Sequence, residues 1–367
     1  MSDETLFAQT YDTSRDLFVA EAGQYDNARI QEFRTDPEAS LLTHTLLLPA
    51  ITKPQRLLVI TSGIHGVEGY IGSVIQRLFL KSLDSWIDRN TTGILLIHAV
   101  NPYGFRHDRR VNAKNIDLNR NGFTVSGNFD KHHNQAYEQL QSFLEPRKCY
   151  ASSRLFRAQA RKQIEHHSQA TVFQAAAGGQ HHSPQGIFYG GDSQEPEVLR
   201  LREIITEHAK DYPTVFLIHL HSGFGQWGHL HLLYPTSSLV QHELLETLFA
   251  GLSINDYLRK HTAYEVVGSL CDFLGEPLRA EGKTYLPVSF EYGTLNTQTM
   301  DGFMETLRRM IVENQIHHWG AKTPEIATHE QQLFREMFYP DDPAWQRSVM
   351  DQTKTVFSTV FSRFHQI

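Results

Sequence analysis

Three side chains that can bind a metal ion follow apolar runs in this 367-residue sequence. His65 and Glu68 lie three residues apart in SGIHGVEGYIGS, directly after RLLVIT, and His221 follows the apolar residues of LIHLHSGFG. In α/β sheets the end of a strand faces the ligand crevice. Because two imidazole nitrogens and a carboxylate with one open position form catalytic zinc sites, these residues predict such a site.

Each of the three residues also has an ordinary structural interpretation. His65 could cap a turn, and Glu68 could stabilise the positive end of the following helix. His221 could be a hydrogen-bonded histidine of the core, since most histidines are not metal ligands. The metal hypothesis therefore requires that all three side chains lie together in the fold.

The stretch VNPYGFRHDRRVNAKNIDLNRNGF, residues 100–123, follows another predicted strand and contains several side chains that bind anions. They are Arg109, Arg110, Asn119 and Arg120. The guanidinium group of arginine forms a planar fork for a carboxylate or a developing oxyanion, and asparagine adds a neutral donor. This stretch predicts a site for an anionic chain end, with a solvated basic loop as the alternative.

Glu291 lies in the apolar stretch YLPVSFEYGT, between Phe290 and Tyr292. Apolar surroundings disfavour the charged form of a carboxyl group and raise its pKa. A carboxylate whose pKa is raised in this way is suited to general base catalysis. The alternative is a strand position that faces outward.

The elements that must position these residues alternate along the chain. Apolar runs bounded by glycine or proline predict strands over residues 41–49, 56–63, 92–102, 213–223, 229–235 and 285–294. Residues 69–87 predict an amphipathic helix, and residues 195–212, with a proline and acidic residues at their front, predict another helix. Residues 130–170 are polar and typical of helices, and residues 171–196 predict a loop region. This alternation predicts an α/β fold with a mostly parallel or mixed sheet.

Composition excludes several classes of protein. The hydrophobic fraction of 40% and charged fraction of 20% are typical of a globular protein. The net charge of −7 argues against a basic surface for nucleic acid or for an anionic membrane. Two cysteines are too few for a disulfide framework. Since neither a signal peptide nor a long apolar run is evident, we expect a cytoplasmic protein.

Two further patterns need interpretation. GFGQWG, residues 223–228, has the spacing of a dinucleotide motif, but the chain continues as the predicted strand HLHLLYP rather than as a helix. Four pairs of adjacent histidines are His132–His133, His166–His167, His181–His182 and His317–His318. These pairs lie in polar stretches that we expect to be exposed, and adjacent side chains on a helix diverge, which argues against a shared metal ion. A second structural metal site is the alternative.

The order of the motifs resembles a known family. H-x-x-E, N-P-x-G-F, R-x-N, D-x-N-R-N, H-S-G and a glutamate on a late strand follow one another as in the M14 zinc carboxypeptidases. More narrowly, the chain resembles the bacterial branch called DUF2817, which SPQGIFYGG and EPEVLRLREII also match. The resemblance covers about residues 1–320 and is more specific than any single motif.

The resemblance implies an α/β/α sandwich around a mixed, mainly parallel eight-stranded sheet with one zinc ion. We expect a catalytic domain over residues 1–320, in which residues 130–185 form a helical and loop insert near the cleft. Residues 321–367 are expected to form a helical extension packed on this domain.

The resemblance also implies roles for single residues. His65, Glu68 and His221 would bind the zinc ion, and Glu291 would be the general base. Arg110 would stabilise the tetrahedral oxyanion, with Arg109 as the second candidate for that role and otherwise a substrate-binding residue. Asn119 and Arg120 would hold the terminal carboxylate of the substrate. Tyr264 would close over the substrate, with Tyr285 and Tyr292 as alternatives.

The resemblance implies a zinc-dependent hydrolase that cleaves an amide bond next to a free carboxylate, as a metallocarboxypeptidase acting on peptides. The same constellation serves deacylases of N-acyl amino acids of the aspartoacylase and succinylglutamate desuccinylase type. An open groove would favour the peptidase and a capped pocket the deacylase. A non-catalytic module that binds a peptide or a metal is a third possibility.

Overall fold

The computed structural model describes residues 6–35, 41–123, 130–147, 152–234, 242–252 and 266–367. These residues form an α/β fold around one mixed sheet, which confirms the predicted fold class. The sheet has seven strands within the described residues, one fewer than the eight predicted.

The sheet has four parallel strands at its centre. Its strands are β1 (Arg29–Phe33), β2 (Thr43–Leu48), β3 (Arg56–Thr61), β4 (Thr92–His98), β5 (Thr214–Ser222), β6 (Leu230–Leu233) and β7 (Thr284–Tyr292). They lie in the order β1-β2-β4-β3-β5-β7-β6. Strands β4, β3, β5 and β7 are parallel to one another, whereas β2 and β6 are antiparallel to their neighbours. The carboxyl ends of these four strands therefore share one edge of the sheet.

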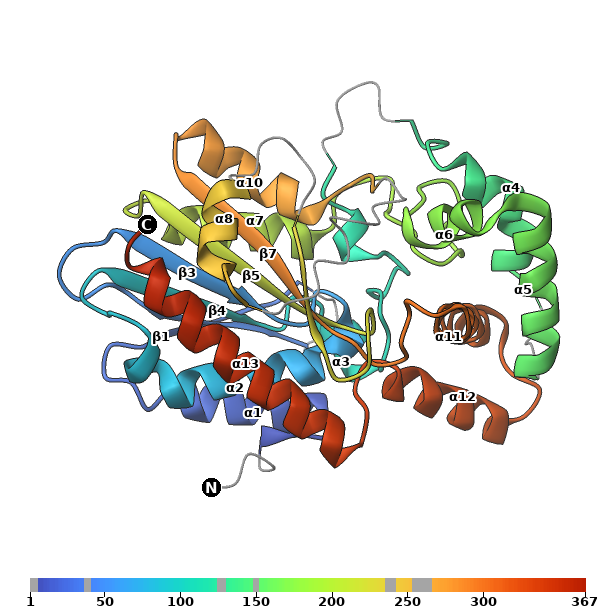
Figure 1. The fold of residues 1–367 in the computed structure, drawn as a ribbon, viewed down its shortest axis with the longest axis horizontal. Helices are drawn as coiled ribbons and strands as arrows, with labels where there is room; N and C mark the ends of the chain where they lie inside the picture. Colours follow the sequence, from blue (N-terminus) through green and yellow to red (C-terminus); the bar gives the residue numbers. More distant parts are fainter. Residues whose placement is uncertain (1–5, 36–40, 124–129, 148–151, 235–241, 253–265) are drawn as a thin grey trace.

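Helices cover both faces of this sheet (Figure 1). One face packs against α1 (Tyr11–Ala22), α2 (Gly69–Trp86), α8 (His242–Phe249) and α13 (Pro343–Phe364). The other face packs against α7 (Pro196–His208) and α10 (Leu270–Ala280). Each face buries its own hydrophobic cluster, which explains why β3, β4 and β5 are continuous apolar runs.

A separate group of helices lies beyond the carboxyl ends of the strands, on the right in Figure 1. It contains α4 (Gln135–Leu144), α5 (Ser153–His167), α6 (Gln169–Ala177), α11 (Met300–Trp319) and α12 (Pro324–Glu336). Helices α4, α5, α6 and α11 bury a third hydrophobic cluster. The predicted loop is wrong for residues 171–177, because Val172, Ala175 and Ala176 pack their apolar side chains into this cluster as part of α6.

The last helix belongs to the main core. Helix α13 buries Trp345, Val349 and Phe357 in the same cluster as α2 and the sheet. The indole N–H of Trp345 donates to the carbonyl oxygen of Gly293 at 2.9 Å. Helix α13 therefore contributes core residues, whereas the division of the chain at residue 320 stays a prediction.

The turn after β5 does not form a dinucleotide site. Gly223 and Gly225 have φ values of 108° and 113°, and the chain then enters strand β6. The helix that would hold a pyrophosphate is thus absent from this described turn.

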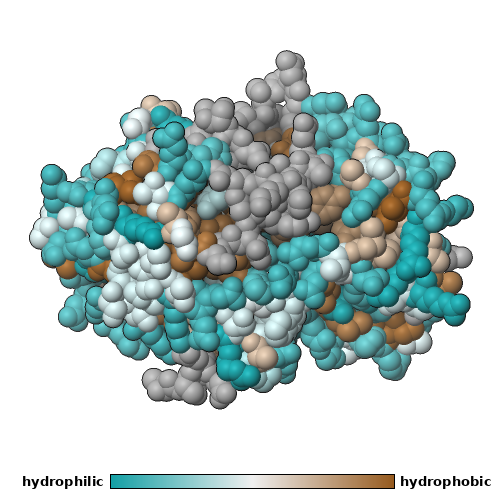
Figure 2. Space-filling model, viewed as in Figure 1, coloured by the Kyte–Doolittle hydropathy of each residue, from teal (hydrophilic) through white to brown (hydrophobic). Residues whose placement is uncertain are grey.

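None of the helices in the described residues combines the length and the apolar character that a membrane crossing requires. Figure 2 shows a mostly hydrophilic surface with smaller apolar areas on the visible face.

Two leucines of α7 test the packing of the second cluster. Leu201 is 2% exposed within this cluster, whereas Leu199 on the same helix is 46% exposed. We expect Leu201→Ala to lower the free energy of unfolding by about 2–5 kcal/mol, because it leaves a cavity. Leu199→Ala should change that free energy by less than about 0.5 kcal/mol. Urea unfolding followed by circular dichroism measures both, and equal losses would contradict the packing described.

Candidate metal centre

Adjacent parallel strands bring the predicted site residues to one edge of the sheet. His221 near the end of β5 is paired in register with Glu291 near the end of β7. Strand β3 lies on the other side of β5 and ends at Thr61. The chain then turns through His65 into the short 3₁₀ helix η2 (Gly66–Glu68), which leads into α2.

The turn at η2 requires a glycine because of a close backbone approach. A Cβ atom on Gly66 would lie 2.1 Å from the carbonyl carbon of Gly104, in α3 (Pro102–Arg106). The backbone N–H groups of Gly66 and Val67 donate to the carbonyl oxygens of Arg110 and Arg109, at 3.1 and 2.9 Å. These contacts fix the arginine-containing segment beside the turn that carries His65 and Glu68.

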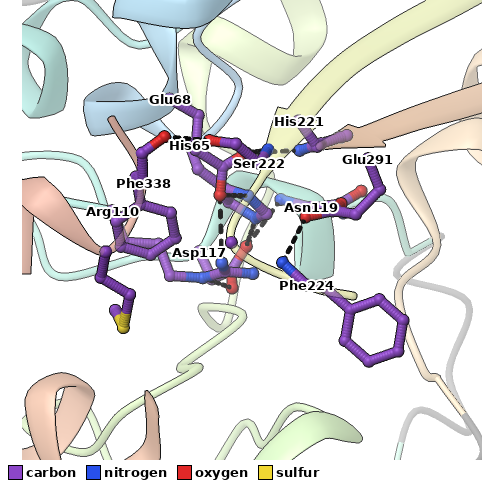
Figure 3. A network of polar contacts seen from close by, with 12 residues as sticks. His65, Glu68, Arg110, Asp117, Asn119, His221, Ser222, Phe224, Glu291 and Phe338 are labelled. Carbon is purple, nitrogen blue, oxygen red and sulfur yellow. Dashed lines mark hydrogen bonds and ion pairs between the residues drawn. The ribbon is translucent and has the colours of Figure 1, made fainter. Parts of the chain in front are cut away.

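The side chains of His65, Glu68 and His221 converge, and all three are buried (Figure 3). His65 Nδ1 lies 2.9 Å from Glu68 Oε1, and His221 Nδ1 lies 2.8 Å from Glu68 Oε2. One ligand atom from each residue lies within 4.8 Å of the others. Two imidazole nitrogens directed at one carboxylate fit a zinc ion, which favours this donor set.

Asp117 supports this triad, although the sequence analysis assigned it no role. His65 Nε2 lies 3.1 Å from Asp117 Oδ1, and Arg110 Nε donates to Asp117 Oδ2 at 3.0 Å. Burial would raise the pKa of Asp117, but the charges of Arg110 and His65 hold that pKa well below its usual range. An anionic Asp117 therefore keeps the Nδ1 atom of His65 directed at Glu68. Its position in the motif D-x-N-R-N was the available signal.

Two buried carboxyl groups of the site have opposite pKa shifts. Burial alone would raise the pKa of Glu68, but the two imidazoles of the triad lower it. Burial and the charge of Glu68 raise the pKa of Glu291 well above its usual value, although the Phe224 N–H and Arg110 oppose this rise. Glu68 is thus suited to binding a cation, and Glu291 to accepting and holding a proton.

The two adjacent arginines diverge. Arg110 lines the cavity at the triad, and its Nη1 lies 3.5 Å from Glu68 Oε1. Arg109 instead donates from Nε to Glu313 Oε1 at 2.7 Å and from Nη2 to Asn115 Oδ1 at 3.0 Å. Among the described residues that line the cavity, Arg109 is absent. The structure therefore does not bring Arg109 to the predicted substrate site. Its guanidinium group instead forms a buried ion pair with Glu313.

Asn119 and Arg120 both line the cavity, in and beside the 3₁₀ helix η3 (Leu118–Arg120). Arg120 Nη2 donates to the carbonyl oxygen of Ala177 at 2.8 Å, which holds the side chain against α6. Gly122 follows at a close approach, since a Cβ atom there would lie 2.6 Å from the carbonyl oxygen of Ser269. The glycine in NRNGF thus lets this segment pack against the start of α10.

The predicted mobile tyrosine, Tyr264, lies outside the described residues. The two alternatives are placed elsewhere. The hydroxyl group of Tyr285 donates to the carbonyl oxygen of Cys271 at 3.0 Å, and that of Tyr292 lies 2.7 Å from Thr353 Oγ1. Both tyrosines are buried, and neither belongs to the described lining of the cavity.

A cavity of about 670 Å³ extends from the triad. Its polar end contains the triad, Arg110, Asn119, Arg120 and Glu291. An apolar wall of the cavity comes mainly from α6 and α11 and includes Phe173, Phe303, Leu307 and Met310. Phe188 also lines the cavity, and its ring centroid lies 5.1 Å from Cζ of Arg110. The volume lies in the range of about 300–1,000 Å³ that is typical of small-molecule sites.

A family model confirms part of the resemblance seen in the motifs. The model of DUF2817, a protein of unknown function, matches residues 7–352. The chain belongs to the DUF2817 family. No curated protein matches this DUF2817 chain.

Several solved structures are similar to the DUF2817 chain. Bovine thrombin-activatable fibrinolysis inhibitor, in complex with tick carboxypeptidase inhibitor, is 15% identical over 89% of this chain and 98% of its own, with a TM-score of 0.45. Carboxypeptidase A from Helicoverpa armigera is 16% identical over 91% and 75%, with a TM-score of 0.46. A metallo-carboxypeptidase from Burkholderia cenocepacia is 14% identical over 82% and 67%, with a TM-score of 0.40.

Proposed function

We propose that this DUF2817 protein is a zinc-dependent hydrolase that cleaves an amide bond next to a free carboxylate, as a metallocarboxypeptidase acting on peptides. One observation carries the proposal. The triad His65, Glu68 and His221 faces the same cavity as the guanidinium group of Arg110 and the carboxyl group of Glu291. Amide hydrolysis requires a site for a metal cation, a hydrogen-bond donor for the developing oxyanion, and a carboxyl group whose raised pKa lets it carry a proton.

The triad would hold one zinc ion through the two Nδ1 atoms and the carboxylate of Glu68. In such a site zinc acts as a Lewis acid and lowers the pKa of water from about 15.7 to about 7. Asp117 fixes the imidazole of His65 in the orientation that leaves Nδ1 available to the ion.

Glu291 and Arg110 would act on the reacting atoms. Glu291 accepts a proton from the attacking water and passes it to the leaving nitrogen, and its raised pKa allows it to hold the proton between these steps. Arg110 donates hydrogen bonds to the oxyanion that forms at the scissile carbonyl, and it stays charged because its pKa is raised by Asp117 and Glu68 against the effect of burial. Loss of one comparable donor costs about 3 kcal/mol.

Asn119 and Arg120 would hold the free carboxylate of the substrate at the polar end of the cavity. Arginine and asparagine together donate several hydrogen bonds to a carboxylate, which fixes the scissile bond relative to the triad. The apolar wall formed by α6 and α11 would then contact an apolar group of the substrate.

Arg120→Ala tests the carboxylate site. Because a hydrogen bond to a charged group contributes about 1.5–3 kcal/mol, kcat/KM for peptides with a free carboxylate should fall by about 10- to 100-fold, mainly through KM. Amidated peptides, which the parent protein should cleave poorly, should be affected little. The ratio of the two rates is the measurement, since a general loss of folded protein leaves a ratio unchanged. Arg200→Ala, an exposed arginine of α7, is the control. An equal fall for both kinds of peptide would contradict this role for Arg120.

Deacylation of N-acyl amino acids is the second candidate. The same residues could hydrolyse an acyl–nitrogen bond, and the apolar wall from α6 and α11 is suited to an acyl group. A panel of matched peptides and N-acyl amino acids, all with a free carboxylate, separates the two activities. Metal binding without turnover of any member of the panel would instead support a non-catalytic binding module.

A further inference from the structure

A second cluster of metal-binding side chains lies in the helical group, at His132, Glu138 and His182. Glu138 is in α4, His132 precedes this helix, and His182 lies in the turn after α6. His132 Nδ1 lies 2.6 Å and His182 Nδ1 lies 4.0 Å from the same oxygen, Glu138 Oε1. One ligand atom from each residue lies within 4.8 Å of the others. Two residues from different histidine pairs are thus brought together across 50 positions of sequence.

The imidazole of His182 has an unexplained environment. Both of its ring nitrogens are shielded from solvent, and neither has a hydrogen-bond partner among the described residues. The ring itself is held in place, because it stacks on His132 at 5.7 Å and meets Tyr137 edge-on at 5.6 Å between centroids. Buried polar atoms in proteins nearly always have a hydrogen-bond partner or a bound ion, so a partner for His182 is expected.

We propose that His132, Glu138 and His182 bind a second divalent metal ion of the zinc type. Two imidazoles and one carboxylate suit zinc, and with bonds of about 2.0–2.2 Å the ligand atoms of a tetrahedral site lie about 3.4 Å apart. The observed distances of 2.6 and 4.0 Å lie on either side of this value. His132 is 67% exposed and can adjust its position. An ion there provides a partner for Nδ1 of His182 and joins the beginning of α4 to the turn after α6.

The site has a structural role rather than a catalytic one. Within the described part of the chain, none of its three residues lines the cavity. The neighbouring His181, however, donates from Nε2 to the carbonyl oxygen of Arg120 at 3.1 Å. Arg120 in turn donates to Ala177 at the end of α6. The second ion therefore fastens the turn that supports Arg120 and the apolar wall, and it is independent of the reaction carried out in the cavity.

Zinc content of the full-length protein tests the proposal. Each variant is dialysed against a chelator, re-equilibrated with micromolar zinc chloride, and analysed by mass spectrometry of the metal. The parent should retain two equivalents and His132→Ala one. His166→Ala is the matched control, because His166 is an exposed histidine of the same helical group outside the cluster, and it should retain two. Because His132 lies at the surface, His132→Ala should unfold at the same temperature as the parent when zinc is absent.

The His221→Ala background separates the two metal sites. This variant loses a ligand of the first site, so it should retain one equivalent, and His132→Ala/His221→Ala should retain none. If His221→Ala does not fold, the difference in zinc content between the parent and His132→Ala decides the question. Glu138→Gln, which removes another ligand of the second site, should then show the same loss of one equivalent. The proposal is overturned if His132→Ala binds as much zinc as the parent. A failure of the first site would instead appear as an unchanged zinc content in His221→Ala.

Discussion

Glu291→Gln should lower kcat by about 100- to 10,000-fold while the zinc content stays at that of the parent. Glutamine has nearly the same size as glutamate, and its Oε1 can still accept the N–H of Phe224 that now bonds to Glu291 at 3.0 Å. It cannot take up a proton from water, however. The change therefore removes proton transfer and leaves the triad and the cavity in place.

Steady-state kinetics and metal analysis on the same preparation measure this effect. Glu165→Gln, at an exposed position of α5, is the control and should have the parent's kcat. If Glu291→Gln retains full turnover, another group is the base. If it loses zinc together with turnover, Glu291 contributes to the metal site rather than to proton transfer.

His221→Ala should lose both the zinc ion of the first site and the activity. The substitution removes one of three ligands and leaves the buried carboxylate of Glu68 without the imidazole that now lies 2.8 Å away. We expect the affinity for zinc to fall by more than the 10- to 100-fold that loss of an outer hydrogen-bond partner typically costs. Equilibrium dialysis with zinc, combined with kinetics, measures both losses.

Asp117→Asn provides the graded comparison for His221→Ala. Asparagine keeps the shape of the side chain beside His65 Nε2 but removes its negative charge, so zinc affinity should fall by about 10- to 100-fold and not be abolished. Full activity of His221→Ala at parental zinc content would contradict the proposed ligand set. Losses of equal size in Asp117→Asn and His221→Ala would show that the two residues do not have different roles.

The fold was predictable where burial on both faces produces a continuous apolar run. Strands β2 to β7 all lie within or at the edges of the predicted stretches for this reason. Strand β1 was missed because RIQEF is an edge strand whose side chains are mostly exposed, and it has no apolar run. Helix α13 was expected in a helical extension packed on the catalytic domain, and its aromatic residues are part of the main core. How deeply the helix is buried depends on the surface against which it packs, and the sequence of the helix alone does not show that surface.

The site was predictable to the extent that strand order could be inferred. His65 and Glu68 follow β3, and His221 lies near the end of β5, its neighbour in the sheet. Glu291 is adjacent to His221 in register. The resemblance placed Arg110 ahead of Arg109, but the residues alone do not show in which direction two adjacent side chains point. The structure shows that the two diverge.

Contacts between distant segments account for what the sequence did not indicate. Asp117 gains its role from the packing of its turn against the η2 segment, and a motif does not show that contact. The pairing of His132 with His182 depends on how α4 and α6 pack against each other. In both cases the partner residues lie far apart in the sequence.

Anomalous diffraction at the zinc absorption edge, from crystals equilibrated with zinc, tests the central claim most directly. The account predicts a peak between His65, Glu68 and His221, about 2.0–2.2 Å from each Nδ1 atom and from a carboxylate oxygen. It also requires that Glu291 and Arg110 face that peak across the cavity. A map from folded, zinc-equilibrated protein with no peak between these three side chains would contradict the account.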